Sequence, residues 1–317
     1  MPRVDNTPES LKPYTFHGVD LQWRDRDTHA KGECPFCGRE GKFMVDLSSG
    51  LWRCLVCAEG TSRGGGNPIV FLRLFHELCW SDNGDYLALA KDRRVDVSTL
   101  MKWGVCRSSL TDDWMVPGYN EAGALMTLYV RKQGTLYPTP TMGHAVFGGN
   151  LYDGSKPIVD VAEGPWDGMA LWESLRSSKR LSNGSLALTG SEASSLLADR
   201  SVVAIPGLGS IGSPLKKWLG FFKGKTVNLW FDSDHPKRTC PNGHSSYSTA
   251  RFNRGCPECG DATGREIMPA GYAGVQRAGA ILKDVAKEIN YCQWGEDGYA
   301  IDKPSGHDLR DELSQTS

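Results

Sequence analysis

Two aspartates one residue apart, Asp232 and Asp234, end the apolar run "KTVNLWFD". The run is typical of a buried strand, in which residues i and i+2 point to the same face, so the two carboxylates are expected to converge. Two unit charges about 4 Å apart repel by roughly 4 kcal/mol at an effective dielectric constant near 20. A metal ion relieves that repulsion, and Mg²⁺ is usually held by one or two carboxylates together with phosphate groups. The alternative is a polar turn after a strand.

A second pair of acids, Glu163 and Asp167, follows the apolar segment "PIVDVA". This segment predicts a strand, "EG" predicts a turn, and "PWDGMALWESL" predicts a helix with Pro165 in its first turn. Glu163 then lies at the carboxyl end of the strand, where open α/β sheets bind ligands. Asp167 alone could simply offset the helix dipole, but the dipole does not account for Glu163.

The cysteines of the amino-terminal region form two C-x-x-C pairs, which suit one tetrahedral zinc site. Its four ligands are Cys34, Cys37, Cys54 and Cys57. The intervening "KFMVD" and "LWRC" predict two strands joined by a turn at "SSG". We therefore predict a zinc ribbon that needs its metal ion to fold.

Three side chains of this ribbon, Lys42, Trp52 and Arg53, are expected on its strand face. There they could bind single-stranded nucleic acid through charge and stacking. The alternative for Trp52 is that its indole packs the ribbon. The sequence leaves both interpretations open.

A second cluster, "CPNGHSSYSTARFNRGCPECG", comes shortly after Asp234. Its cysteines and one histidine suit a second zinc ion. The four predicted ligands are Cys240, His244, Cys256 and Cys259. Because the cluster begins so close to Asp234, it should project from the end of the acidic strand.

Length and composition limit the class of protein. A chain of 317 residues with 39% hydrophobic content suits a globular protein of two or three small domains. The formal net charge is −1, so any nucleic-acid contact must come from local basic patches. No apolar run is long enough to span a membrane, and the first residues lack the apolar core of a signal peptide. Clustered cysteines favour metal sites in a reducing compartment, so we expect a cytoplasmic protein.

Further apolar segments complete an alternating pattern. "SVVAIP" and "KTVNLWFD" predict strands, whereas "SPLKKWLGFF" and "AGYAGVQRAGAILKDVAKEI" predict helices. With the elements around Glu163, the order is strand–helix–strand–helix–strand–helix, which indicates a parallel α/β sheet with acids at its strand ends. No phosphate-binding loop of the form G-x-x-x-x-G-K-[ST] occurs.

Four motifs follow one another in the chain: "EGPWD", "DSD", a helix containing "AG", and "DLRD" in the tail. This set resembles the TOPRIM domain, which primases, topoisomerases and some nucleases share. With a four-cysteine ribbon in front, the chain is similar to primases. The stretches "FGGNLYDGSKPIVDVAEGPWDGMAL" and "MVPGYNEAGALMTLYVRKQG" resemble the primase half of bacteriophage primase–helicases, and the resemblance spans roughly residues 30 to 315.

The resemblance implies a role for each matching residue. Glu163 matches a catalytic glutamate that assists removal of the proton from an attacking 3′-hydroxyl. The acids that match ligands or neighbours of one or two Mg²⁺ (or Mn²⁺) ions are Glu163, Asp167, Asp232, Asp234 and Asp308. Arg131 and Lys132 match basic residues near the triphosphate.

The sequence departs from this pattern at two places. The "AG" at Ala273 and Gly274 follows "DSD" only after the long stretch that holds the second cluster. His307 stands where a basic residue often precedes the final aspartate.

The resemblance implies a DNA primase that makes short RNA primers on single-stranded DNA from ribonucleoside triphosphates. A replicative helicase is expected to act in trans, and the location is the host cytoplasm if a phage encodes the chain. Two alternatives stay open: a TOPRIM nuclease or topoisomerase-like enzyme, and a non-catalytic zinc module that binds DNA. A template-dependent assay with ribonucleotides distinguishes the three.

The expected fold is a multidomain chain that combines α+β and α/β parts. A four-cysteine zinc ribbon comes first, then a small mixed α+β subdomain, then a TOPRIM parallel α/β domain with a second zinc ribbon inserted. The expected ranges are the ribbon at 1–63, a linker with helices at 64–105, the amino-terminal subdomain of the polymerase core at 106–157, and the TOPRIM domain at 158–317 with its insertion at 235–272.

Overall fold

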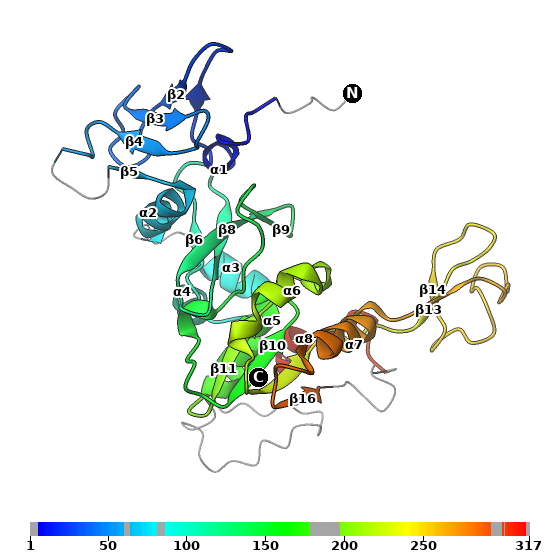
Figure 1. Ribbon diagram of the computed structural model, residues 1–317. Coiled ribbons are helices and arrows are strands. Elements are labelled where there is room, and N and C mark those ends of the chain that lie inside the picture. Colours follow the sequence, from blue (N-terminus) through cyan, green and yellow to red (C-terminus); the bar gives the residue numbers. More distant parts are fainter. Residues whose placement is uncertain are drawn as a thin grey trace. The chain divides into compact units, whose positions relative to one another are not determined.

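The computed structural model describes residues 6–59, 64–80, 86–177, 197–292, 300 and 302–314 (Figure 1). By their contacts the residues group into two units. Unit 1 comprises residues 1–89 and 100–145, and unit 2 comprises residues 90–99 and 146–317. The four domain ranges expected from the sequence remain a prediction, because the contacts do not separate the ribbon from the helices that follow it.

Unit 1 contains two antiparallel sheets among its described residues, in the strand orders β1-β2-β3-β4-β5 and β6-β7-β8-β9. Its elements are α1 (Lys12–Thr15), β1 (Leu21–Gln22), β2 (His29–Gly32), β3 (Phe43–Asp46), β4 (Trp52–Cys54), β5 (Gly65–Gly66), α2 (Pro68–Trp80), β6 (Cys106–Arg107), β7 (Trp114–Tyr119), β8 (Leu125–Lys132) and β9 (Thr135–Pro138). Helices α3 (Tyr86–Arg93) and α4 (Val97–Lys102) each cross the boundary between the units.

The two strands and the turn expected for the first ribbon are present. Strand β3 pairs antiparallel with β4, and the Asp46 carboxylate accepts hydrogen bonds from the backbone N–H groups of Ser48 and Ser49 at 3.0 and 2.7 Å. Gly50 has φ +69°, a conformation that glycine adopts without strain. The "SSG" turn is therefore confirmed, and it is fixed by Asp46.

The ribbon shares its hydrophobic core with helix α2. The rings of Phe43 and Trp52 stack with centroids 5.2 Å apart, and Phe71 of α2 meets Trp52 edge-on at 6.1 Å. Met115 of β7 and Leu128 of β8 belong to the same buried cluster. A ribbon of this size cannot bury much apolar surface alone, so α2 and the second sheet supply what it lacks.

Unit 2 is built on a parallel sheet in the order β11-β10-β12-β16. Its elements are β10 (Ile158–Ala162), α5 (Pro165–Ser177), β11 (Arg200–Ala204), α6 (Ser213–Lys217), β12 (Thr226–Trp230), β13 (Lys237–Arg238), β14 (Tyr247–Ser248), β15 (Glu266–Ile267), α7 (Ala270–Leu282), β16 (Glu288–Tyr291) and α8 (Leu309–Ser314). The predicted parallel α/β arrangement is confirmed for these residues.

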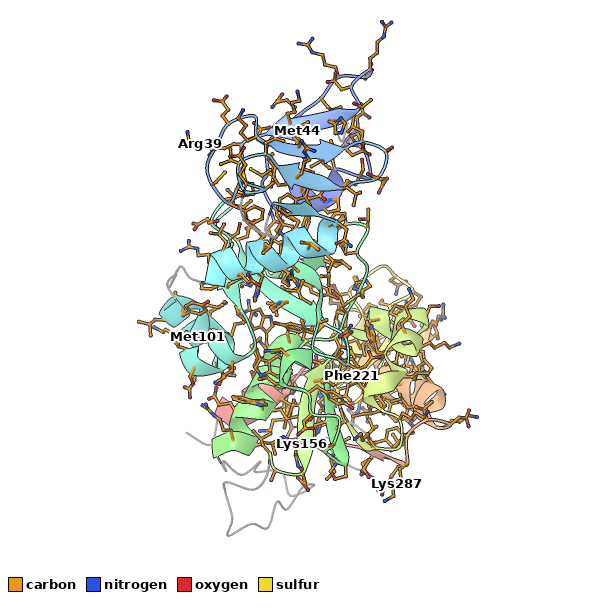
Figure 2. The ribbon with its side chains drawn as sticks, turned by 60° about the vertical axis from the view of Figure 1, so that its left-hand side comes forward. Arg39, Met44, Met101, Lys156, Phe221 and Lys287 are labelled. Carbon is orange, nitrogen blue, oxygen red and sulfur yellow. The ribbon has the colours of Figure 1, made fainter. Side chains whose placement is uncertain are left out.

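Alternate residues of the strands face helices α6 and α7. Val159, Val227 and Leu229 are buried in one cluster with Leu215 of α6 and Val275 of α7. Phe221, labelled in Figure 2, is fully buried in this cluster and meets the ring of Tyr152 edge-on at 4.8 Å. This packing holds the strand ends, and the acids that follow them, in a fixed frame.

Two helices are shorter than their sequence patterns predict. The helix expected over residues 270–289 ends at Leu282, whose carbonyl accepts hydrogen bonds from the N–H groups of Val285 and Ala286. The chain then turns and forms β16, a fourth parallel strand that pairs with β12 and was not predicted. The helix expected over residues 213–222 ends at Lys217 and continues as a 3-10 turn around Gly220, a poor helix former.

The predicted insertion between β12 and α7 is a separate small sheet. Strand β13 pairs antiparallel with β14 and with β15, and Cys240, Tyr247 and Cys256 form its own buried cluster. Figure 1 labels β13 and β14 among the yellow loops of this insertion.

Candidate active site and metal centres

Glu163 and Asp232 meet at the carboxyl edge of the parallel sheet. Strands β10 and β12 are in register with Ala162 beside Trp230, so the residues that follow these strands are neighbours. The backbone N–H of Asp232 lies 3.4 Å from Glu163 Oε2. These two acids therefore meet at the strand ends. Strand β12 itself stops at Trp230, so the strand alternation that was expected to align Asp232 with Asp234 does not reach them.

Asp234 is held by the start of helix α7. The N–H of Gly271 donates to Asp234 Oδ2 at 2.9 Å. A Cβ at Gly271 would lie only 2.3 Å from the Asp232 carbonyl oxygen, so glycine is required for this close approach. The "AG" that the resemblance singles out, Ala273 and Gly274, lies further along the same helix. The first "AG", at Ala270 and Gly271, is the one that contacts the "DSD" segment.

Asp308 is brought to the acidic site by a short backbone bridge. The N–H of Ser233 donates to the His307 carbonyl at 2.9 Å, and the N–H of Gly306 donates to the Ser233 carbonyl at 3.0 Å. His307 is 2% exposed and its Nδ1 lies 3.7 Å from Asp311 Oδ2, so its ring packs inside the unit. The segment after the bridge places Asp308 beside the strand end that carries Asp232.

A residue that the sequence did not single out, Arg310, divides the acids into two groups. Its Nε donates to Asp167 Oδ1 at 3.0 Å, and its Nη2 pairs with Asp308. Within the described residues, no basic nitrogen lies within 4.0 Å of a carboxylate oxygen of the remaining acids, Glu163, Asp232 and Asp234. The motif "DLRDEL" offered a signal, since it places an arginine two residues after the predicted acid Asp308. An arginine that close can pair with the carboxylate and offset its charge.

The environment raises the pKa of three of these carboxyl groups. Burial raises the pKa of Asp232 from 3.8 to about 9, and the negative charges of its neighbours, Glu163 first, add to this effect. Burial likewise raises the pKa of Glu163 to about 7, with Asp234 and Asp167 contributing. For Asp167 burial raises the pKa to about 6, although the attraction of Arg310 lowers it. Without a cation these carboxyl groups therefore tend to keep their protons, and a bound cation would favour their ionised forms.

Hard carboxylate oxygens at a strand edge are the donor set that Mg²⁺ and Mn²⁺ accept. Among the described residues, the sets of three or more ligand-type side chains with donor atoms within 4.8 Å of one another are the two cysteine clusters. The carboxylates are spread more widely. This spacing suits an ion that keeps water or phosphate ligands and takes only one or two carboxylates directly.

The first cysteine cluster has the geometry of a zinc centre. Cys34 Sγ lies 3.9 Å from Cys57 Sγ, and Cys37 Sγ lies 3.7 Å from Cys54 Sγ. A tetrahedron with Zn–S bonds of about 2.3 Å requires sulfur–sulfur separations of about 3.8 Å. The N–H of Cys57 also donates to Cys54 Sγ at 3.4 Å. These four residues fit one zinc ion, as predicted.

The second cluster fits zinc equally well and uses His244 through Nδ1. This nitrogen lies 3.5 Å from Cys240 Sγ and 3.6 Å from Cys256 Sγ, while Cys240 Sγ lies 3.5 Å from Cys259 Sγ. A tetrahedral zinc ion with three sulfur ligands and one nitrogen ligand gives sulfur–nitrogen separations of about 3.6 Å. The four donor atoms therefore support a second zinc ion.

The two predicted nucleic-acid contacts of the first ribbon, Trp52 and Arg53, differ in their exposure to solvent. Trp52 is only 2% exposed, and its indole lies against Phe36, Phe43 and Phe71. It packs the ribbon and has no free face on which a base could stack, so its assignment as a nucleic-acid contact is corrected. Arg53 points away from this core and is exposed.

Arg131 and Lys132 end strand β8 in unit 1. Arg131 is half-buried, whereas Lys132 is exposed and its Nζ lies 4.8 Å from the ring centroid of Phe16. Their predicted place near a triphosphate remains a prediction. None of the described helices is both long and apolar enough to cross a membrane.

Comparisons with known proteins gave matches among solved structures. No family model and no curated protein matches the chain. The chain is similar to the primase fragment of the bacteriophage T7 primase-helicase protein, with 18% identity over 86% of this chain and 90% of that one and a TM-score of 0.40. It is also similar to the zinc-binding and RNA polymerase domains of the Aquifex aeolicus primase, with 13% identity, 98% and 82% coverage and a TM-score of 0.43. A third similarity, to the DnaG catalytic core, has 11% identity, 78% and 74% coverage and a TM-score of 0.45. Because these TM-scores are below 0.5, the function proposed next rests on this chain's own residues.

Proposed function

We propose that this chain is a DNA primase that joins ribonucleotides on a single-stranded DNA template by metal-dependent nucleotidyl transfer. The observation that carries the proposal is the cluster of carboxylates at the carboxyl edge of the parallel sheet, where burial and mutual repulsion raise the pKa of Glu163 and Asp232. Structural acids are normally paired with cations. Here, three of the five described acids of the cluster have no basic partner, which is the arrangement that a catalytic metal site needs.

Each acid has a role that its surroundings support. Glu163 has a pKa of about 7, so near neutral pH it can accept the proton of an attacking 3′-hydroxyl. Asp232 and Asp234 would offer carboxylate oxygens to a divalent cation, and the Gly271 N–H fixes the orientation of Asp234. Mg²⁺ or Mn²⁺ bound there would supply positive charge for the attacking and leaving oxygens of the displacement.

For Asp167 and Asp308 we propose a different role from the one that the resemblance implied. Both are engaged by Arg310, whose single positive charge offsets part of their negative charge. We infer that they hold the Arg310 guanidinium beside the acidic site, and that Glu163, Asp232 and Asp234 bind the metal ion first. Asp308 becomes a metal ligand only if Arg310 moves away.

The remaining parts of the proposal concern substrates and partners. Arg131 and Lys132 would contact the triphosphate of a ribonucleotide, and Arg53 with Lys42 would contact the template through the exposed face of the first ribbon. A replicative helicase acting in trans and a location in the host cytoplasm belong to the same proposal.

The test is primer synthesis on single-stranded DNA with ribonucleotides and Mg²⁺. The wild-type chain should make short RNA products, and Glu163→Gln should lose them because the amide cannot accept a proton. Asp284→Asn, which removes an exposed acid after helix α7, should match the wild type. Strand scission without synthesis would support a nuclease instead, and DNA binding without either reaction would support a zinc-containing binding module.

A further inference from the structure

The second ribbon carries an exposed loop of mixed basic and aromatic character. Residues 249–255, "TARFNRG", lead from β14 to Cys256. Arg251 and Arg254 are exposed, and 44% of Phe252 between them remains exposed. In the first ribbon, by contrast, the aromatic side chains of Phe43 and Trp52 are buried. An exposed ring flanked by arginines is the composition that binds single strands by stacking and charge.

Basic side chains outnumber acidic ones in and around this loop. The sequence from His235 to Pro257 contains two lysine or arginine residues besides Arg251 and Arg254, and no acid. The Arg251 guanidinium donates to the Lys303 carbonyl at 2.7 Å, a contact that leaves its positive charge uncompensated.

Three acids complete the ribbon, against five lysine and arginine residues between His235 and Tyr272. Glu266 pairs with Arg238. The Asp261 carboxylate accepts hydrogen bonds from the N–H and hydroxyl of Thr263, both at 2.8 Å. Glu258 lies 3.9 Å from His244 Nε2. The loop between β14 and Cys256 therefore keeps a local positive charge although the whole chain is close to neutral.

The loop is held in one conformation by its own backbone. The Phe252 N–H donates to the Ser248 carbonyl at 2.9 Å, and the Gly255 N–H donates to the Phe252 carbonyl at 3.2 Å. Gly255 has φ +117°, and a Cβ there would lie 2.3 Å from the Gly260 carbonyl oxygen, so the loop packs tightly on the chain that carries Cys256 and Cys259. A fixed loop loses little conformational entropy when it binds a ligand.

The base of the ribbon is tied to the segments that carry the acidic site. The Thr249 N–H donates to the carbonyl of Pro236, which is two residues beyond Asp234. His235 is 1% exposed, and its ring contacts Ser248 Oγ at 3.1 Å and the Ala300 carbonyl at 3.0 Å. These contacts attach the start of the loop to the "DSD" segment.

We propose that residues 249–255 form a binding site for single-stranded DNA, with Phe252 stacking on a base and Arg251 and Arg254 contacting phosphates. The site extends the proposed function by supplying a second place, outside the first ribbon, that holds the template. It rests on the proposed function only for the identity of the strand, since the binding itself requires neither nucleotides nor Mg²⁺.

The experiment measures binding of a fluorescein-labelled oligo(dT) of about 15 nucleotides, a length within the usual site sizes, to the full chain across a salt series. Arg251→Ala with Arg254→Ala should reduce the slope of log affinity against log salt by about 1.4, because each phosphate contact on a single strand contributes about 0.7. Phe252→Ala should weaken binding roughly tenfold with an unchanged slope, and Phe252→Trp should restore it.

The matched control is Lys216→Ala with Lys217→Ala, which removes two exposed charges from helix α6 of the same unit. Zinc content, measured for every variant, reports whether the ribbon has folded. An unchanged slope for the arginine variant, or an equal change in the lysine control, would overturn the proposal. A loss of oligo(rU) binding alone would overturn the assignment to DNA. If the variants lose oligo(dT) binding but the wild-type chain makes no primers, the binding site is supported and the proposed primase function is refuted.

Discussion

Replacing Asp232 by asparagine should make the Mg²⁺-free protein more stable at alkaline pH while it abolishes primer synthesis. Asp232 lies beside Glu163 at the edge of the sheet, and burial together with neighbouring charges raises its pKa from 3.8 to about 9. Between these two values, the folded chain binds one proton more at this position than the unfolded chain does. Stability is therefore lost as pH rises through this window.

The magnitude follows from the proton difference. One proton corresponds to about 1.4 kcal/mol of unfolding free energy per pH unit, so Asp232 accounts for a loss of roughly 3 kcal/mol between pH 6 and pH 8. Glu163, with a pKa of about 7, adds to the loss in the lower half of this range. The two groups titrate together, so the measured loss belongs to the pair.

Urea unfolding at pH 6, 7 and 8, followed by tryptophan fluorescence in Mg²⁺-free buffer without a zinc chelator, measures this dependence. Wild type should lose about 4 kcal/mol from pH 6 to pH 8, roughly 3 from Asp232 and about 1 from Glu163, whereas Asp232→Asn should lose less than half as much. Adding Mg²⁺ should restore the wild type and leave the variant unchanged. Asp284→Asn should behave like the wild type. A variant whose stability falls with pH as steeply as that of the wild type would refute the reasoning.

Two further predictions concern the supports of the site. Arg310→Ala should destabilise the chain by about 3 kcal/mol, because it leaves the buried carboxylates of Asp167 and Asp308 without their cation; Arg310→Lys should recover part of this, and urea unfolding of both variants measures it. An unfolding free energy equal to that of the wild type would show that Arg310 does not balance these acids. Metal analysis of the purified chain should find two zinc ions, with one retained in Cys54→Ser and one in Cys259→Ser. The Cys54→Ser variant should unfold at lower urea concentration, because its zinc site shares a core with helix α2, and equal midpoints for the two variants would contradict that coupling.

Both cysteine clusters were accessible from the sequence because their spacing alone satisfies tetrahedral geometry. The close approach of Glu163 to Asp232 was also predictable, since the carboxyl ends of neighbouring parallel strands share one edge of a sheet. In each case the sequence near each residue predicts where that residue lies: a cysteine pair on one zinc ion, or an acid at the carboxyl end of a strand.

The fate of Trp52 could not be predicted in this way. Its place on a short strand is compatible with either face, and burial depends on Phe71, a residue of the helix α2 that follows the ribbon. The end of helix α7 at Leu282 had the same cause, because the apolar pattern continues to Ile289 while pairing with β12 draws Glu288–Tyr291 into a strand. Long-range contacts decided both outcomes.

The tertiary structure likewise decided which acids pair with Arg310 and which do not. Sequence motifs identified Glu163, Asp167, Asp232, Asp234 and Asp308 as a set, because residue type and strand position are local properties. Only the fold placed Arg310 between Asp167 and Asp308 and, within the part of the chain that the structure describes, left the other three acids without a basic partner. The energy of a charge depends on every neighbouring charge and on burial, and both quantities arise when distant segments pack together.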